Sequence, residues 1–312
     1  MSALVHHPVL LREVLEGLAI KPDGVYVDAT FGRGGHSTAI LAKLESKGRL
    51  LAFDKDPAAI KAAATQETFK DERFLLQQGS FTMLLNSIQQ QGLVGKVDGI
   101  LFDLGVSSPQ LDDPARGFSF LHDGPLDMRM NPAVGVSAAT WLNAAPEKEI
   151  ATVLKEYGEE RYAKRIAKAL VGERAQQPIL TTGRLAEIVK RAHPRWERHK
   201  HPATRSFQAI RIFVNQELTE LQIVLEQCIE ALAVGGRLVV ISFHSLEDRV
   251  VKRFMQGKTQ QENEVLRGLP IPTVTVAPRL RRIGKLIKPT QEEIAQNLRA
   301  RSAILRVAEK IV

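Results

Sequence analysis

The feature that most constrains this chain is the run 25–36, in which an apolar stretch ends in an acid and then in closely spaced glycines. Residues 25–27 are β-branched or aromatic and follow a Pro-Asp-Gly turn signal, which predicts a buried strand. Gly32, Gly34 and Gly35 come next, and helical periodicity follows them. A strand, a glycine turn and a helix form the first unit of a doubly wound α/β domain, whose ligand lies beyond the carboxyl ends of the strands.

The glycine spacing does not fit a dinucleotide site. A dinucleotide fingerprint has a third glycine where this chain has Ser37. Asp28 also stands at the end of the strand, where a carboxylate would repel a pyrophosphate and attract a cation. S-adenosylmethionine carries an ammonium and a sulfonium and no phosphate, so it has the required character. For this run taken alone, an ordinary tight turn without a ligand remains the alternative.

Two further predicted strands end in acids at the same edge. Residues 49–54 end in Asp54, which stands about 20 residues past the glycines, where a carboxylate accepts hydrogen bonds from ribose hydroxyls. Capping of the next helix is the alternative role for Asp54. Residues 97–103 end in Asp103. Carboxylates gathered at one edge repel one another unless a ligand offsets their charge, so this row predicts a cationic nucleoside ligand.

Phe81 follows another predicted strand, 73–79, and falls on the same edge. It would pack either against an adenine or in the core. His244, at the end of the strand 237–243, would either position substrate or be a structural histidine.

Composition narrows the class of protein. A length of 312 residues fits one large domain or two of ordinary size, and a net charge of +8 favours RNA as a partner. The chain has no apolar run long enough for a membrane helix and no signal-peptide pattern at its start. Its single cysteine, Cys228, suits a reducing compartment. We therefore expect a cytoplasmic protein.

The pattern of strands stops after Asp103, and helical periodicity takes over. We predict an inserted helical domain at 111–204 within an α/β domain formed by 1–110 and 205–312. Its expected helices span 146–157, 159–174 and 183–192, and one long helix is then expected over 205–232.

Two basic stretches, 191–205 and 257–292, are candidates for phosphate contact, with a solvated loop as the alternative. The histidines of the first stretch lack accompanying carboxylates or cysteines, so we expect no metal. Phe118 and Phe120 lie in an arginine-containing loop that would either grip a base or pack on the core.

Residues 107–110, Ser-Ser-Pro-Gln, resemble the motif after the fourth strand in enzymes that methylate exocyclic amines of bases. There, a short polar side chain and a carbonyl held by proline accept hydrogen bonds from the amine and aim its lone pair at the methyl group. The resemblance implies that Ser107, Ser108 and Pro109 position the amine. Gln110 replaces the usual aromatic residue, so base stacking would come from elsewhere, such as Phe118 or Phe120.

Six runs together resemble the bacterial 16S ribosomal RNA cytosine-N4 methyltransferases, a class I S-adenosylmethionine-dependent family. The runs are 30–36, 103–110, 116–120, 126–129, 201–205 and 242–249, and the resemblance covers nearly the whole chain. The resemblance implies a Rossmann-like, mostly parallel methyltransferase sheet with an inserted all-helical domain. It also implies S-adenosylmethionine as the methyl donor and a decoding-centre cytidine of the small ribosomal subunit as the substrate. A homodimer is left open.

The same resemblance implies a set of donor contacts. They fall on residues Gly34, Gly35, His36, Asp54, Phe81, Asp103 and Gln110. A direct contact from Asp28 is our own inference.

Three other functions are weaker. Methylation at cytosine C5 needs a cysteine nucleophile, and Cys228 falls within a predicted helix away from the strand edge. A nicotinamide dehydrogenase is disfavoured by the missing glycine and by Asp28. A non-enzymatic RNA-binding protein on a methyltransferase scaffold is disfavoured by the intact row of carboxylates.

Overall fold

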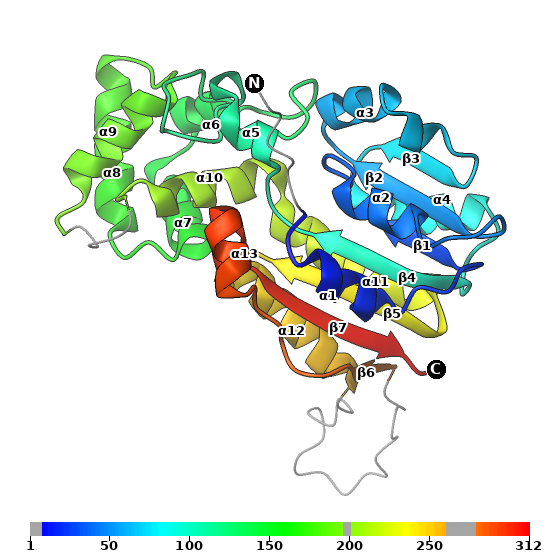
Figure 1. The fold of residues 1–312 in the computed structure, drawn as a ribbon. Coiled ribbons are helices and arrows are strands. Elements are labelled where there is room, and N and C mark those ends of the chain that lie inside the picture. The colour runs from blue at the N-terminus through cyan, green and yellow to red at the C-terminus, as the bar shows by residue number, and fades with distance from the viewer. Residues whose placement is uncertain (1–7, 196–200, 260–278) are drawn as a thin grey trace, which may run out of the picture. The chain divides into compact units, whose positions relative to one another are not determined.

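A computed structural model of the chain describes residues 8–195, 201–259 and 279–312 (Figure 1). The chain divides into two compact units, one formed by 1–105 and 218–312 and the other by 106–217. The second unit is longer than the 111–204 that we expected, because α10 (Thr204–Asn215) belongs to it. The side chains of Phe207 and Ile210 on α10 are buried in its core. The units are described separately below.

The first unit is built on a sheet of seven strands in the order β3-β2-β1-β4-β5-β7-β6. Strands β1 to β5 run parallel, whereas β7 is antiparallel to both β5 and β6. The strand order reverses between β1 and β4, which is where doubly wound sheets bind their ligands. The doubly wound, mostly parallel sheet expected from the sequence is confirmed. Its strands are β1 (Val25–Asp28), β2 (Arg49–Asp54), β3 (Phe74–Gln78), β4 (Val97–Asp103), β5 (Leu232–Ser242), β6 (Leu280–Arg282) and β7 (Ile304–Lys310).

Helices cover both faces of this sheet, because successive strand residues point to opposite faces. Tyr26 of β1 and Leu101 of β4 pack in a core with α1 and α2, whereas Val27 and Phe102 pack in a second core with α4, α11 and α12. The helices of the unit are α1 (Leu11–Leu18), α2 (Gly35–Leu41), α3 (Pro57–Ala64), α4 (Leu84–Gln90), α11 (Glu217–Ala231), α12 (Ser245–Thr259) and α13 (Gln291–Gln296). Short 3-10 helices span Glu67–Lys70, Phe81–Met83 and Leu298–Ser302.

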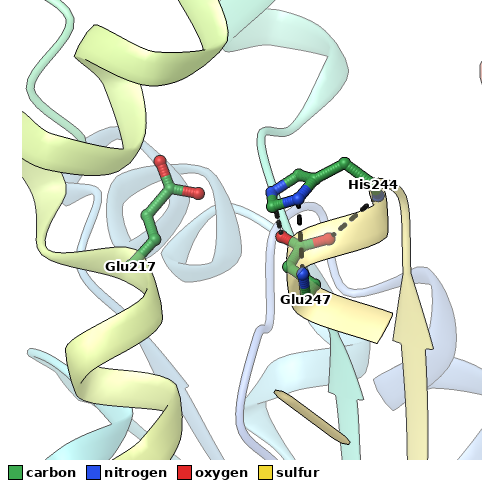
Figure 2. Close-up of side chains that lie close together, drawn as sticks. All are labelled: Glu217, His244 and Glu247. Carbon is green, nitrogen blue, oxygen red and sulfur yellow. Dashed lines mark hydrogen bonds and ion pairs between the residues drawn. The ribbon is translucent and has the colours of Figure 1, made fainter. Parts of the chain in front are cut away.

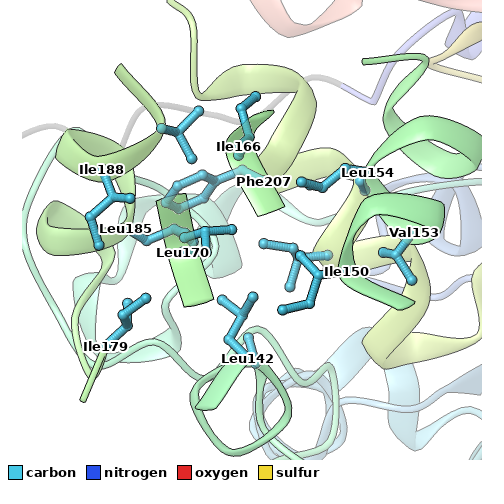
Figure 3. Close-up of a cluster of buried hydrophobic side chains, with 14 of the residues drawn as sticks. Leu142, Ile150, Val153, Leu154, Ile166, Leu170, Ile179, Leu185, Ile188 and Phe207 are labelled. Atoms are coloured by element: carbon cyan, nitrogen blue, oxygen red, sulfur yellow. The ribbon is translucent and has the colours of Figure 1, made fainter. Parts of the chain in front are cut away.

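The second unit is helical, and its described residues form no strand longer than an isolated bridge between Pro125 and Thr181. Its helices are α5 (Ser108–Asp112), α6 (Ala138–Ala144), α7 (Glu147–Gly158), α8 (Ala163–Gln176), α9 (Thr182–Ala192) and α10, with a 3-10 helix at Pro114–Arg116. Apolar side chains from α6 to α10 meet in one core, which Figure 3 shows around Leu170. A separate core of this kind is what allows a segment to form its own compact unit.

Several sequence expectations about helices need correction. The predicted long helix at 205–232 is two helices, because Gln216 takes a left-handed conformation with φ of 53° between α10 and α11. The second of them, α11, ends at Ala231, and the chain enters β5 at Leu232. The helix expected to begin at residue 159 begins at Ala163, because Glu159 has φ of 49° and ends α7. Strand β6 and the helices α4, α5, α6 and α13 were not predicted. Among the described residues, no helix combines the length and the apolar character needed to cross a bilayer.

Candidate functional site

Three carboxylates end three adjacent strands at the carboxyl edge of the sheet. Asp54, Asp28 and Asp103 end β2, β1 and β4, which are neighbours in that order. Burial raises the pKa of Asp28 and of Asp54 to about 6 each. The pKa of Asp103 is raised to about 8, first by burial and then by the charges of Asp28 and Glu247. The charged forms of these acids are therefore destabilised at this edge, and a bound cation would stabilise them.

Asp28 fixes the glycine turn through hydrogen bonds to both of its carboxylate oxygens. One of its oxygens accepts a hydrogen bond from the Thr30 amide at 3.1 Å, and the other accepts one from the Ser37 hydroxyl at 2.7 Å. The side chain is only 1% exposed. The observed role of Asp28 is thus to fix the turn, and its direct contact with a donor stays a prediction.

The turn itself needs glycine. Gly34 has φ of 75°, and a Cβ atom added there would lie 2.3 Å from the ring of Phe69. A Cβ on Gly35 would lie 2.5 Å from the side chain of Pro8. The two glycines allow the backbone to take this path close to its neighbours and keep its amides near the carboxyl edge.

Asp54 connects the end of β2 to the same turn. Its Oδ2 accepts a hydrogen bond from the Gly32 amide at 2.7 Å, and its Oδ1 accepts one from the Asp56 amide at 2.7 Å. The cap of α3 is Asp56, which accepts a hydrogen bond from the Ala58 amide. The capping alternative for Asp54 is therefore taken by its neighbour. A carboxylate has lone pairs beyond these two bonds, so Asp54 can still accept from a ribose.

Asp103 is tied to β1 and faces His36. Its amide donates to the Thr30 hydroxyl at 2.6 Å, and its Oδ2 lies 3.6 Å from Nδ1 of His36. The Nε2 atom of His36 lies 3.0 Å from the carbonyl of Val9, which fixes the ring. The Oδ1 atom of Asp103 is buried and has no hydrogen-bond partner within the described part of the chain. A buried acceptor without a partner fits a ligand that brings a donor, such as an ammonium group or a hydroxyl.

The loops after β2 and β3 contact a further acid that the sequence did not reveal. Glu220 of α11 accepts a hydrogen bond from the Ser80 hydroxyl at 2.7 Å and pairs with Lys55 at 2.6 Å. Phe81, next to Ser80, packs edge-on against Phe102 with ring centroids 5.6 Å apart. Phe81 is only partly buried, so one part packs on the core and the rest stays available to a ligand.

A histidine and a glutamate three residues apart lie where the chain passes from β5 into α12 (Figure 2). The Glu247 carboxylate accepts hydrogen bonds from the amides of Phe243 at 2.8 Å and His244 at 3.3 Å. Nδ1 of His244 accepts in return from the Glu247 amide at 3.4 Å. This reciprocal pattern resembles a capping box at the start of α12 and favours the structural role for His244. Glu247 is 2% exposed, and its charge raises the pKa of Asp103.

The predicted amine-positioning residues lie in the helical unit, a few residues after Asp103 in the sequence. Ser107 is the N-cap of α5 and forms a capping box with Gln110, whose Oε1 accepts from the Ser107 amide at 2.9 Å. Ser108 and Pro109 form the first turn of this helix. The box fixes the local conformation of the run. Contacts of Ser107, Ser108, Pro109 and Gln110 with an amine or a donor stay predictions.

Of the two phenylalanines proposed to stack on a base, Phe118 is excluded. Its side chain is 6% exposed and belongs to the core of the helical unit. Phe120 is partly buried between Phe207 and His201, with ring centroids 4.8 Å and 4.6 Å away. Both rings thus favour the alternative in which this loop packs on the core.

The two basic stretches are only partly within the described residues, since 196–200 of the first and 260–278 of the second lie outside them. In the described part of the first, Arg191 lies 3.4 Å from Glu173 and His193 lies 3.5 Å from Glu160. Both side chains have acidic neighbours, so they are less available to phosphate than the sequence suggested.

Comparisons with known proteins agree with this geometry. The MraW methylase family model matches residues 3–311. Proteins named ribosomal RNA small subunit methyltransferase H are similar over 306 residues, or 98% of this chain. The one from Nitrosococcus oceani is 59% identical and covered over 96% of its length, and those from Coxiella burnetii and Legionella pneumophila are 56% and 55% identical and covered over 99%.

Solved structures are more distant: an rRNA methylase from Streptococcus thermophilus is 13% identical with a TM-score of 0.42, covering 99% of this chain and 100% of its own. That likeness carries no part of the argument. S-adenosylmethionine, the cofactor expected from the row of acids, agrees with membership of a methylase family. The resemblance drawn from the six sequence runs is confirmed, and the chain belongs to the MraW methylase family.

Proposed function

We propose that the chain transfers a methyl group from S-adenosylmethionine to the exocyclic N4 amine of a cytidine in the decoding region of 16S ribosomal RNA. The observation that carries this proposal is the row formed by Asp54, Asp28 and Asp103, in which each pKa is raised by burial or by neighbouring charge. Such a row favours a ligand that is both cationic and a nucleoside. The small-subunit RNA methyltransferases to which the chain is 55–59% identical support ribosomal RNA as the substrate.

Each residue at the carboxyl edge binds a different part of the methyl donor. S-adenosylmethionine supplies a methyl group that is already activated by the positive sulfur. Asp54 accepts hydrogen bonds from the ribose, and Asp103 offers its unpartnered oxygen to a polar group of the donor. Gly34 and Gly35 bring the backbone close to the ligand, and the exposed part of Phe81 packs against the adenine. Because the donor is activated, the protein contributes mainly alignment and exclusion of water.

The choice of the N4 amine rests on two features. The Ser-Ser-Pro run at 107–109 offers short acceptors to the two amine hydrogens, which directs the nitrogen lone pair to the methyl group. The competing reaction at C5 needs a thiolate, but Cys228 is fully buried in α11 and burial raises the pKa of its thiol. The basic composition of the chain suits a ribosomal RNA partner. Because that partner is cytoplasmic, the reaction would take place in the cytoplasm.

Transfer of labelled methyl groups to isolated small subunits and to naked 16S RNA, followed by nucleoside analysis, tests this proposal. We expect the label in N4-methylcytidine. The Asp103→Asn variant should lose transfer, whereas Asp23→Asn, a matched loss of an exposed acid ahead of β1, should retain it. Label on C5, on ribose or on protein would reject the stated chemistry. Binding of RNA with neither donor binding nor transfer would instead support a non-enzymatic RNA-binding protein.

A further inference from the structure

A hollow of about 750 Å³ lies within the sheet unit, away from the row of carboxylates. It is bounded by α12, β6 and β7 and by the residues that directly follow β6. Five cationic side chains line it: Lys252, Arg281, Arg282, Lys285 and Arg306. No acidic side chain is among the described residues that line it. The volume is that of an ordinary ligand site.

Three of the five cations have no acidic partner within the described ranges. Arg306 is held by both oxygens of Asp248, at 2.7 and 3.0 Å, and Arg281 pairs with Glu309. Lys252, Arg282 and Lys285 are exposed, and no ion pair or hydrogen bond joins their side chains to a described residue. Their charges therefore remain available to an anion from outside.

The floor of the hollow is apolar and its rim is charged. Met255 and Leu280 are 1% exposed and Val307 is 6% exposed, and all three line it. Leu286 is 43% exposed on the same lining. An apolar floor beneath unpaired cations suits a ligand that has both a flat apolar part and a phosphate.

The adjoining strand adds main-chain donors. Strand β6 pairs only with β7 among the described strands, so it forms an edge of the sheet. An edge strand presents amides that no neighbouring strand uses. Cations and an apolar floor at a sheet edge together match a nucleotide of single-stranded RNA better than they match a bare anion.

We propose that this hollow, the β6 hollow, is a second RNA-docking site in which Lys252, Arg282 and Lys285 hold backbone phosphates and the apolar floor receives an unstacked base. The inference rests on the proposed function for the identity of the RNA. β6 lies three strands from β4 in the sheet, which corresponds to about 14 Å. The site would therefore hold nucleotides that flank the methylated one in space.

The test is binding of labelled naked 16S RNA to the full chain over a series of salt concentrations. The triple variant Lys252→Gln, Arg282→Gln and Lys285→Gln removes the three unpaired charges. We expect its dissociation constant to rise by at least about tenfold and the magnitude of the slope of log K against log salt to fall by about 2. The matched control is Lys43→Gln, Lys47→Gln and Lys61→Gln, which removes three exposed cations from segments away from the hollow. In this control, both the dissociation constant and the salt slope should change less than in the triple variant of the hollow.

Donor binding by calorimetry should be unchanged in both triple variants, which separates loss of RNA docking from misfolding. Equal losses of RNA affinity in the two variants would overturn the proposal, because the effect would then be one of net charge alone. Loss of binding to phosphatidylglycerol vesicles without loss of RNA affinity would also overturn it and assign the hollow to a lipid surface. If no methyl transfer to RNA is found, the proposed function is wrong. The RNA affinities of the two triple variants still test whether the β6 hollow binds RNA.

Discussion

Ionisation of Asp103 should control donor affinity. In the absence of a ligand, burial and the charges of Asp28 and Glu247 raise its pKa to about 8. The carboxyl is therefore largely protonated at pH 6 and must lose its proton before it can pair with a cationic donor. Binding would return the pKa toward its ordinary value of about 4. Affinity for S-adenosylmethionine should consequently rise with pH.

The magnitude follows from linkage. With a pKa of about 8 for the free protein and about 4 for the complex, the association constant should fall by about 25-fold from pH 7.5 to pH 6. In Asp103→Asn, only the weaker dependence that comes from Asp28 and Asp54 should remain, and affinity should be low throughout the range. Below pH 6, the titration of Asp28 and Asp54, each with a pKa of about 6, should lower affinity in both proteins.

Isothermal titration calorimetry in two buffers of different ionisation enthalpy measures both the affinity and the protons released on binding. At pH 7.5, where Asp28 and Asp54 are already ionised, we expect the protein to release most of one proton, and Asp103→Asn to release almost none. A flat affinity profile between pH 6 and 7.5 would refute the reasoning. The same would follow if Asp103→Asn retained the slope of the unmodified chain.

Three other predictions concern stability, the cysteine and the glycine turn. The pKa values of Asp28, Asp54 and Asp103 are raised in the folded state, so their contribution to stability is complete below about pH 4 and is lost as the pH rises through 6 and 8. In donor-free calorimetry at pH 8, Asp103→Asn should therefore melt at a higher temperature than the unmodified chain. A lower melting temperature would contradict this. Cys228→Ala should transfer methyl groups at a rate within about twofold of the unmodified chain, because the buried thiol does not act as a nucleophile. Loss of activity in a folded variant would instead support methylation at cytosine C5. Gly34→Ala should lose donor affinity, because its Cβ would lie 2.3 Å from Phe69. The control Gly92→Ala has a similar φ of 68° and no atom within 4 Å of the added Cβ, so it should cost only about 1 kcal/mol of folding stability. Equal donor affinity in the two variants would show that the clash is relieved.

The sequence predicted the strands that are buried and sharply bounded. Strands β2 and β4 occupy the expected 49–54 and 97–103, because each is an apolar run that ends in an acid. Strand β6 could not be found in this way. It has only three residues, of which Arg281 and Arg282 are exposed, and its conformation comes from pairing with β7. The break at Gln216 was also hidden, because apolar spacing continues across it.

The candidate site shows the same division between local and distant signals. Asp28, Asp54 and Asp103 were found because each acid ends a predicted strand of a parallel sheet. Glu220 reaches Ser80 and Lys55 from a helix that lies 140 residues later than Ser80, so no local pattern connects them. Glu247 lay within a recognised run, but its effect on Asp103 depends on the end of β5 lying beside β4. Phe118 looked available in the sequence because the loop around it gives no periodicity that would indicate burial.

The position of β7 between β5 and β6 has a consequence for how the chain is made. Residues 304–310 form the last strand of the described chain, yet they fill an interior place in the sheet. A nascent chain can assemble β1 to β5 during translation, but it must leave the flank of β5 bare until those residues emerge. An uncovered flank of this kind invites pairing with other chains, so newly made molecules should be most prone to aggregate in the interval before β7 is added.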